Sequence, residues 1–392
     1  MKYDFLHCMD RSHSNGIKYT RRLKLFKTKD LIPMWVADMD IDTPSFVVQA
    51  VKKRLEFTNF GYEELPLSTI ISQINWIKRH HGLEFRPEEF LYSHSVVASI
   101  NVAIEAFSDI GDNIIVQTPV YPPFFKSIVT HDREVLYNPL KRDEDGSYSF
   151  DIEDLLSKIN NKTKMLLLCS PHNPVGRVWR EEELRELADI CVEHNIVVFA
   201  DEIHSDLVYD PNIHTPFASL GSDVKKLTIT AMGVGKTFNM AGFAISSIII
   251  SDDNLRKTFK IVYDKIHFAQ GASLSHIAME YAYNHGDQWL KELKEHLVDN
   301  LYMLQQVCKK HSDKISLIPP QGTYLAWLDC AGMNLNDSEL NNFFIHKAKL
   351  GLSSGIAFSR NGSGHMRLNF AVSSEIMMRA IDQLDGALVD FK

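Results

Sequence analysis

The sequence has 392 residues, of which 45% are hydrophobic, and its 42 lysine and arginine residues against 50 aspartate and glutamate residues give a net charge of −8. These values are typical of a globular protein with a large core and exclude a disordered chain, a collagen-like repeat and a disulfide scaffold. The negative charge also argues against a dedicated binder of nucleic acid or of anionic membranes, because both need a basic face.

Two further observations bear on the compartment. The N-terminus shows no cationic start followed by an apolar stretch, and the apolar runs 165–169 and 245–250 are far shorter than the about 20 residues that cross a membrane. The five cysteines form no Cys-x-x-Cys pair and no spacing typical of metal ligands. We therefore expect a cytoplasmic protein without a bound metal.

The elements expected in the first 250 residues change character along the chain. The first 45 or so residues show no clear repeating pattern, and Pro44 then opens a helix as its first residue. Farther on, short apolar or β-branched runs alternate with segments of helical spacing such as 181–194. This alternation predicts an α/β fold in which helices cover both faces of a mostly parallel sheet. The expected strands are 113–117, 164–169, 195–200, 227–231 and 244–250.

Beyond Gly286 the alternation ends, and helices and short strands follow in a pattern typical of a smaller α+β domain. We expect both chain ends to share this domain. The sequence thus predicts a large domain over 47–286 and a small domain made of 1–46 and 287–392. The elements expected in the C-terminal part are a long amphipathic helix to about residue 311, strands over 323–328 and 366–371, and helices over 338–349 and 374–389.

A lysine in a glycine-flanked turn is the first candidate for chemistry, because it follows an expected strand at the edge where such sheets bind ligands. Gly235-Lys236-Thr237 is similar to part of a nucleotide-binding phosphate loop, but the glycine needed five positions before Gly235 is Thr230. That loop is therefore excluded. Lys236 is either a surface lysine beside a turn or an amine kept from water and able to form a Schiff base.

Four more features stand at expected strand ends or inside a strand, and each has two interpretations. Asp201 can cap a helix or hold a cationic ring nitrogen. Asn173 can belong to an ordinary Asn-Pro turn or donate to a phenolate oxygen of a ligand. Tyr121, in a proline-rich loop, can pack on the surface or stack on a planar ring. Arg367 needs either an internal acid or a carboxylate ligand.

The order and spacing of these features are more specific than any one of them. Nearly the whole chain resembles the fold-type I pyridoxal-phosphate enzymes related to aminotransferases. It is most similar to the MalY/PatB group of cystathionine β-lyases, which includes cystalysin-type carbon–sulfur lyases. The segments that carry the resemblance are WVADMD (35–40), FGY (60–62), QTPVYPPF (117–124), SPHNPVGRVW (170–179), DEIHSDLV (201–208), KTFN (236–239) and MRLNFA (366–371).

The resemblance implies pyridoxal 5′-phosphate as cofactor and a role for each of several side chains. Lys236 would form the Schiff base and later move protons at the substrate α-carbon. Asp201 would keep the pyridine nitrogen protonated, so that the ring accepts electrons. Tyr121 would stack on the ring, and Asn173 and His204 would hydrogen-bond its phenolate oxygen.

The same resemblance implies contacts for the two anionic groups of the ligands. The backbone N–H groups of Val96 and Val97, at a helix start, would bind the phosphate. Tyr62 would reach the phosphate in the neighbouring subunit, which implies a homodimer. Arg367 would hold the α-carboxylate of the amino-acid substrate, and Trp35 is a candidate for the wall of the substrate pocket.

The chain departs from the pattern of these relatives around the phosphate. Gly235 stands where many relatives carry serine, and Gly233 where some carry a second serine, so two hydroxyl donors are missing. Ala244 stands where aminotransferases usually have an arginine, and Ser95 where relatives often have glycine. Glycine backbone can still form an anion-binding nest.

Three functions are compatible with these residues. The leading one is β-elimination on L-cystathionine or a related L-cysteine thioether, which gives a thiol, pyruvate and ammonia. An aminotransferase would use the same lysine and the same electron-accepting ring. A cofactor-binding regulator with low turnover is the third, although it would not need the carboxylate at Asp201.

Overall fold

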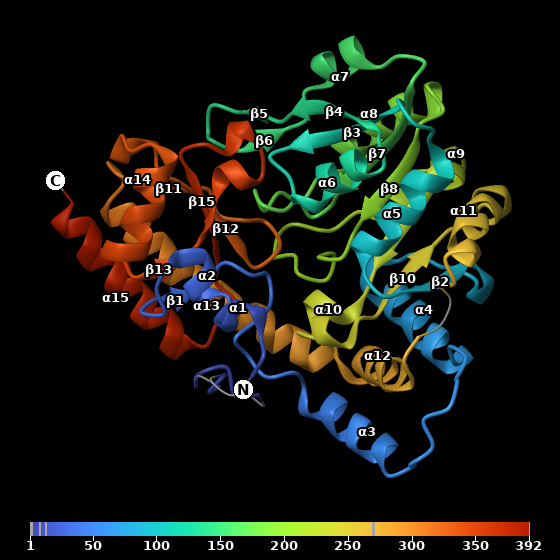
Figure 1. Cartoon of the computed structure of the whole chain (residues 1–392), viewed down its shortest axis with the longest axis horizontal. Coiled ribbons are helices and arrows are strands. Elements are labelled where there is room, and N and C mark those ends of the chain that lie inside the picture. Colours follow the sequence, from blue (N-terminus) through green and yellow to red (C-terminus); the bar gives the residue numbers. More distant parts are fainter. Residues whose placement is uncertain (1–2, 8, 12–13, 269–270, 392) are drawn as a thin grey trace.

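The fold was analysed in a computed structural model, which describes residues 3–7, 9–11, 14–268 and 271–391 (Figure 1). Cys8 lies outside these residues, and the other four cysteines are free and buried. Within the described ranges, no helix has the length and apolar character needed to cross a membrane. The same ranges contain no group of three or more His, Cys, Asp or Glu residues that could hold a metal ion.

A seven-stranded sheet forms the centre of the molecule, in the order β2-β10-β9-β8-β7-β3-β4. All its strands run parallel except β10, which is antiparallel to both of its neighbours. The predicted α/β fold with a mostly parallel sheet is therefore confirmed. The strands are β2 (Phe90–Ser93), β3 (Asn113–Thr118), β4 (Glu134–Pro139), β7 (Thr163–Cys169), β8 (Val197–Asp201), β9 (Thr228–Met232) and β10 (Ser246–Ile249).

Helices cover both faces of this sheet, and successive residues of a strand pack against opposite layers. In β7, Met165 and Leu167 belong to one buried cluster with α5, α6 and α11, whereas Leu166 and Leu168 belong to another with α7, α8 and α9. Strands buried on both faces explain why their sequences are continuous apolar runs. These helices are α5 (Val96–Phe107), α6 (Pro123–Thr130), α7 (Ile152–Lys158), α8 (Glu181–Glu193), α9 (Ser222–Leu227) and α11 (Asp253–Lys265).

The N-terminal residues, where the sequence shows no repeating pattern, form short elements that join the C-terminal part. Strand β1 (Ile32–Pro33) pairs in parallel with β13 (Leu350–Gly351). Helix α3 (Ser45–Leu55) begins one residue later than predicted, because Pro44 is its N-cap and not its first helical residue. The remaining elements of this region are α1 (Ile17–Thr20), α2 (Arg22–Phe26) and α4 (Leu67–His81).

A four-stranded antiparallel sheet, in the order β11-β12-β15-β14, lies in the C-terminal part. The predicted helix over 338–349 is confirmed except for its last two residues: α14 (Asp337–Asn342) continues as a π-helical turn, Phe343–Lys347, and β13 begins at Leu350. The other elements are β5 (Lys141–Arg142), β6 (Tyr148–Ser149), α10 (Val234–Thr237), α12 (Ser273–His285), α13 (Asp287–Lys310), β11 (Ser316–Leu317), β12 (Leu325–Asp329), β14 (Ser353–Ser354), β15 (His365–Asn369) and α15 (Ser374–Asp390).

The largest buried cluster joins residues from both parts of the chain. It contains Val47 of α3 and Trp76 of α4 together with Leu297 of α13 and Leu368 of β15. The proposed division into a large domain over 47–286 and a small domain from the two chain ends stays a prediction.

Candidate active site

A cavity of about 480 Å³ opens where strands β3, β7, β8 and β9 end. Side chains from the loops after these strands line it together with the start of α5 and residues from both chain ends. Nine of the ten residues predicted for the site meet there, although they come from segments up to 332 residues apart. They are Trp35, Val96, Val97, Tyr121, Asn173, Asp201, His204, Lys236 and Arg367.

Lys236 lies on the short helix α10, which directly follows β9. Its amine donates a hydrogen bond of 2.6 Å to the carbonyl oxygen of Ala37. Burial and the nearby charge of Arg367 lower the pKa of this amine to about 8, although Asp38 and Asp201 oppose the shift. Near neutral pH a larger fraction of Lys236 is therefore neutral than of a lysine in water, and a neutral amine is a nucleophile.

Asp201 is the last residue of β8 and is buried. One carboxylate oxygen accepts a hydrogen bond of 3.2 Å from the backbone N–H of Ile203. Burial raises the pKa of Asp201 to about 7, against the weaker opposing effects of that hydrogen bond and of Lys236. A carboxylate in this setting favours a protonated partner.

Arg367 is buried in β15 and has no carboxylate partner among the described residues. Its guanidinium donates to the side-chain oxygen of Asn173 at 2.9 Å and to the carbonyl oxygen of Trp35 at 2.6 Å. Its Nε is buried without a hydrogen-bond partner, and burial lowers the pKa of Arg367 to about 10. A buried cation with a free donor suits an anionic ligand such as a carboxylate.

The contact between Arg367 and Asn173 also orients the asparagine amide. Because Oδ1 of Asn173 accepts from the arginine, its NH2 group remains as a donor toward the cavity. His204 is buried with no partner for Nδ1, and burial together with the charges of Lys236 and Arg367 holds its pKa well below the usual range. This imidazole is therefore neutral. Tyr121 follows β3, and burial raises the pKa of its hydroxyl.

The start of α5 forms another part of the cavity wall. Ser95 is the N-cap, and its hydroxyl accepts a hydrogen bond of 3.2 Å from the N–H of Ala98. Val96 and Val97 are the first two helical residues, so their N–H groups have no acceptor within the helix. These N–H groups and the helix dipole favour an anion at this end of the cavity.

The two glycines before Lys236 differ in the space around them. A Cβ at Gly235 would lie 3.6 Å from the nearest atom, in Ala241, which is an ordinary contact. A Cβ at Gly233 would lie 3.0 Å from Cα and Cβ of Ser246. Ser246 also lines the cavity, and its hydroxyl donates to the carbonyl oxygen of Ser93 at 3.4 Å.

Several lining residues were missed by the sequence analysis. Ser246 and Phe358 carry no local signal, and Arg21 lies in a region without a repeating pattern. Cys169 is the last residue of an expected strand, and this position was the only sequence signal that it lies at the cavity. Burial raises the pKa of its thiol. Tyr324, whose hydroxyl donates to the carbonyl oxygen of Ala37 at 2.9 Å, was also not anticipated.

Tyr62 is the predicted site residue that does not line the cavity. Its side chain is 95% exposed, in the segment between α3 and α4. The predicted role of Tyr62 is in the site of a neighbouring subunit, and a single chain leaves this prediction open.

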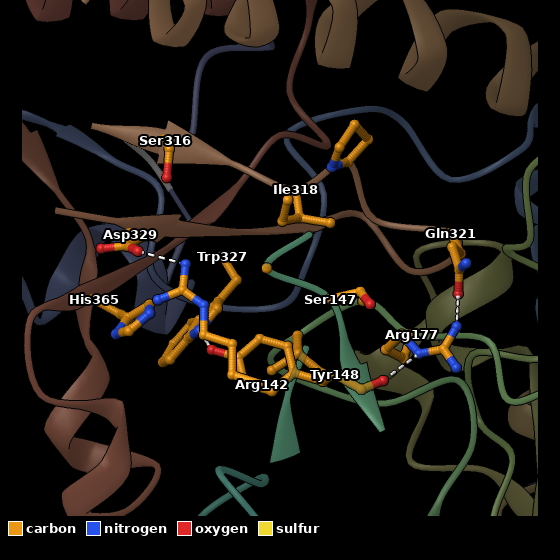
Figure 2. Close-up of a pocket in the computed structure, with 14 residues that line it drawn as sticks. Arg142, Ser147, Tyr148, Arg177, Ser316, Ile318, Gln321, Trp327, Asp329 and His365 are labelled. Atoms are coloured by element: carbon orange, nitrogen blue, oxygen red, sulfur yellow. Dashed lines mark hydrogen bonds and ion pairs between the residues drawn. The ribbon is translucent and has the colours of Figure 1, made fainter. Parts of the chain in front are cut away.

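A second pocket, of about 50 Å³, lies where the β5–β6 hairpin meets β12 and β15 (Figure 2). Its two arginines are satisfied by the protein: Arg142 pairs with Asp329 at 2.6 Å, and Arg177 donates to the side chain of Gln321 at 2.7 Å. Arg177 also forms an ion pair with Glu183 at 2.5 Å. This second pocket is small, and the charges of both arginines are neutralised within the chain. We therefore interpret it as a gap in the packing between elements and not as a second ligand site.

Comparisons with known proteins agree with this geometry. The sequence profile of the aminotransferase class I and II family matches residues 29–384. The cystathionine β-lyase PatB of Bacillus subtilis is 36% identical over 380 residues, which cover 97% of this chain and 98% of PatB.

Comparison with solved structures also finds similarity to pyridoxal-phosphate enzymes. Cystalysin from Treponema denticola, which contains a pyridoxal 5′-phosphate cofactor, is 30% identical with a TM-score of 0.96, and the match covers both chains in full. The pyridoxal-phosphate-bound carbon–sulfur lyase from Staphylococcus hominis is 32% identical with a TM-score of 0.90, and the match covers 99% of each chain.

Proposed function

The chain belongs to the aminotransferase class I and II family, and we propose on this basis that it is a pyridoxal-phosphate-dependent carbon–sulfur β-lyase. Its reaction is β-elimination on L-cystathionine or a related L-cysteine thioether, which gives a thiol, pyruvate and ammonia. The observation that carries the proposal is the cavity in which the Lys236 amine, with a pKa lowered to about 8, lies with the buried Asp201 and the unpaired Arg367.

The residues of the cavity fit the cofactor. Asp201, buried without a basic partner at hydrogen-bond distance among the described residues, suits a protonated ring nitrogen, and the free NH2 group of Asn173 suits a phenolate oxygen. The N–H groups of Val96 and Val97 suit a phosphate. When bound, pyridoxal phosphate supplies an electron sink for the charge that develops at the substrate α-carbon.

The chain's own groups supply the remaining functions. Arg367, held by Asn173 and Trp35, offers Nε to the substrate α-carboxylate and thereby orients the α-carbon. The neutral amine of Lys236 takes the α-proton, which its lowered pKa allows near neutral pH. His204 is a weaker base than Lys236, because burial and the charges of Lys236 and Arg367 hold its pKa well below the usual range, so it does not compete for that proton.

We propose that the active enzyme is a homodimer in which Tyr62 contacts the phosphate of the partner's site. Arg54 shapes the segment that carries Tyr62, because it donates to the carbonyl oxygens of Phe57 at 2.9 Å and of Asn59 at 3.1 Å. Figure 1 shows this segment as an extended stretch between α3 and α4 at the edge of the molecule. Exposed apolar side chains around it, which favour a protein contact, are Leu55, Phe57, Phe60, Leu67 and Ile71.

We also place the enzyme in the cytoplasm, because the four described cysteines are free thiols. Free thiols of this kind suit a reducing compartment.

The activity is tested by incubating the cofactor-loaded protein with L-cystathionine and measuring pyruvate and homocysteine. We expect both products in equal amounts, and no turnover by Lys236→Ala. Conversion of the cofactor to its amine form by a non-sulfur amino acid, with a keto acid as product and no pyruvate from L-cystathionine, would favour an aminotransferase. Cofactor binding without turnover of either kind would favour a regulator.

A further inference from the structure

Arg21 is a cation at the cavity that the proposed reaction does not use. It lies between α1 and α2, one helical turn after Ile17, and both residues line the cavity. Its side chain is exposed, and within the described part of the chain its guanidinium has no hydrogen bond or ion pair. An arginine with all its donors free at the edge of a ligand cavity is available to an anion.

Arg21 is the one basic lining residue among those described to which the proposed reaction gives no role. Asp201 is the single carboxylate among the described lining residues, whereas Arg21, Lys236 and Arg367 are basic. The cofactor phosphate faces the start of α5 and the substrate α-carboxylate faces Arg367. Lys236 and Arg367 thus have assigned roles, and the guanidinium of Arg21 remains available to a further anionic group on the substrate.

A chain of contacts holds helix α1, which ends next to Arg21, relative to Arg367. The buried amine of Lys18, on α1, forms ion pairs with Asp38 and Asp40 at 3.0 and 3.1 Å. The indole N–H of Trp35 donates to the carbonyl oxygen of Lys18 at 3.1 Å, and the carbonyl oxygen of Trp35 accepts from Arg367 at 2.6 Å. Helix α1 is therefore tied to the residue that holds the α-carboxylate, which favours a defined distance between the two arginines.

We propose, on the basis of the proposed function, that Arg21 binds a carboxylate at the far end of the thioether substrate. The preferred substrates are then L-cysteine thioethers whose second arm ends in a carboxylate, as in L-cystathionine. Thioethers with an uncharged arm, such as S-ethyl-L-cysteine, bind through Arg367 without this second contact. The planar guanidinium suits a carboxylate because it can donate two parallel hydrogen bonds.

The test compares L-cystathionine with S-ethyl-L-cysteine in the holoenzyme and in three variants. We expect Arg21→Ala to raise KM for L-cystathionine about tenfold, which corresponds to about 1.4 kcal/mol, while kcat/KM for S-ethyl-L-cysteine changes less than about twofold. Arg21→Lys keeps the charge without the fork and recovers part of the loss. Lys24→Ala, an equal loss of charge on α2 away from the cavity, is the matched control and leaves the ratio of the two substrates unchanged.

Equal losses with both substrates in Arg21→Ala would show a structural role and overturn the inference, as would an unchanged KM for L-cystathionine. Failure of the proposed function is a different result, in which the wild-type holoenzyme releases no pyruvate from either compound. Binding of the two compounds, followed by the absorbance of the cofactor, then still tests Arg21. A selective weakening of L-cystathionine binding supports the inference, and equal weakening or none overturns it.

Discussion

At the scale of single residues, we expect opposite effects on cofactor binding and stability when serine replaces each of the two glycines before Lys236. Gly235→Ser adds a hydroxyl donor where a Cβ meets nothing closer than 3.6 Å. One additional hydrogen bond to the phosphate is worth about 1 kcal/mol, so we expect about fivefold tighter binding of pyridoxal phosphate by the apoprotein. Titration with pyridoxal, which lacks the phosphate, should show no gain.

Gly233→Ser is the matched control, because its Cβ would lie 3.0 Å from Ser246. We expect a loss of about 1–3 kcal/mol in the free energy of unfolding and no tighter cofactor binding. Equal gains in affinity from both substitutions would contradict the steric difference between the two positions, and no gain from Gly235→Ser would contradict the assignment of this end of the cavity to the phosphate.

Asp201 gives a prediction for the pH dependence of stability in the apoprotein. Its pKa is about 7 in the folded protein against an ordinary value of 3.8. Between these values the folded state keeps a proton that the unfolded state has lost, so this carboxyl makes stability fall as pH rises and has its full cost above about pH 7.

Asp201→Asn removes this titration. We expect the variant to match the wild-type apoprotein near pH 4 and to exceed its free energy of unfolding by a few kcal/mol at pH 8. Denaturant unfolding at the two pH values measures the difference, and an equal difference at both would contradict the raised pKa.

At the scale of elements, the start of α5 has two functions that one substitution pair can separate. Ser95→Ala removes the N-cap and should lower the free energy of unfolding by about 1 kcal/mol. Ser95→Asp keeps a capping oxygen but adds a negative charge beside the expected phosphate. We expect it to preserve stability and to weaken binding of pyridoxal phosphate about tenfold or more, with little effect on pyridoxal. Retained affinity in Ser95→Asp would place the phosphate elsewhere.

The elements also show where local patterns are reliable. The five expected strands exist because strands buried on both faces need continuous apolar runs, which can be read from the sequence. The two strands that were missed, β2 and β4, are the edge strands of the sheet, where each strand has only one neighbour. The apolar spacing after Asn342 is that of a helix, and the chain stays helical to Lys347, two residues before the predicted end, because β13 then pairs with β1.

At the scale of the whole molecule, the dimer predicts complementation between inactive subunits. A mixed dimer of Lys236→Ala and Tyr62→Ala chains contains one site that has both substitutions and one that has neither. We expect mixing and refolding to restore activity up to about a quarter of wild type, since about half the dimers are mixed and each has one intact site. Light scattering should give twice the 44.8 kDa mass of the chain. A site made by one chain would gain nothing from mixing.

The sequence by itself determined five of the seven strands of the central sheet and their alternation with helices, because apolar periodicity is a local property. It also determined that Lys236, Asp201, Asn173 and Tyr121 follow strand ends, which parallel pairing then brings to one edge. Only the tertiary structure decided that Arg367 has no internal acid, since its neighbours Asn173 and Trp35 are far away in sequence.

The tertiary structure likewise decided the pKa values of Lys236 and Asp201 and the position of Arg21 at the cavity. The pKa values of Lys236 and Asp201 shift because packing of distant segments removes water from them, and no local pattern contains that information. Arg21 reaches the cavity because Lys18, on the same helix, is buried between two aspartates. Contacts between segments far apart in sequence, and not the residue types alone, therefore turn these side chains into one site.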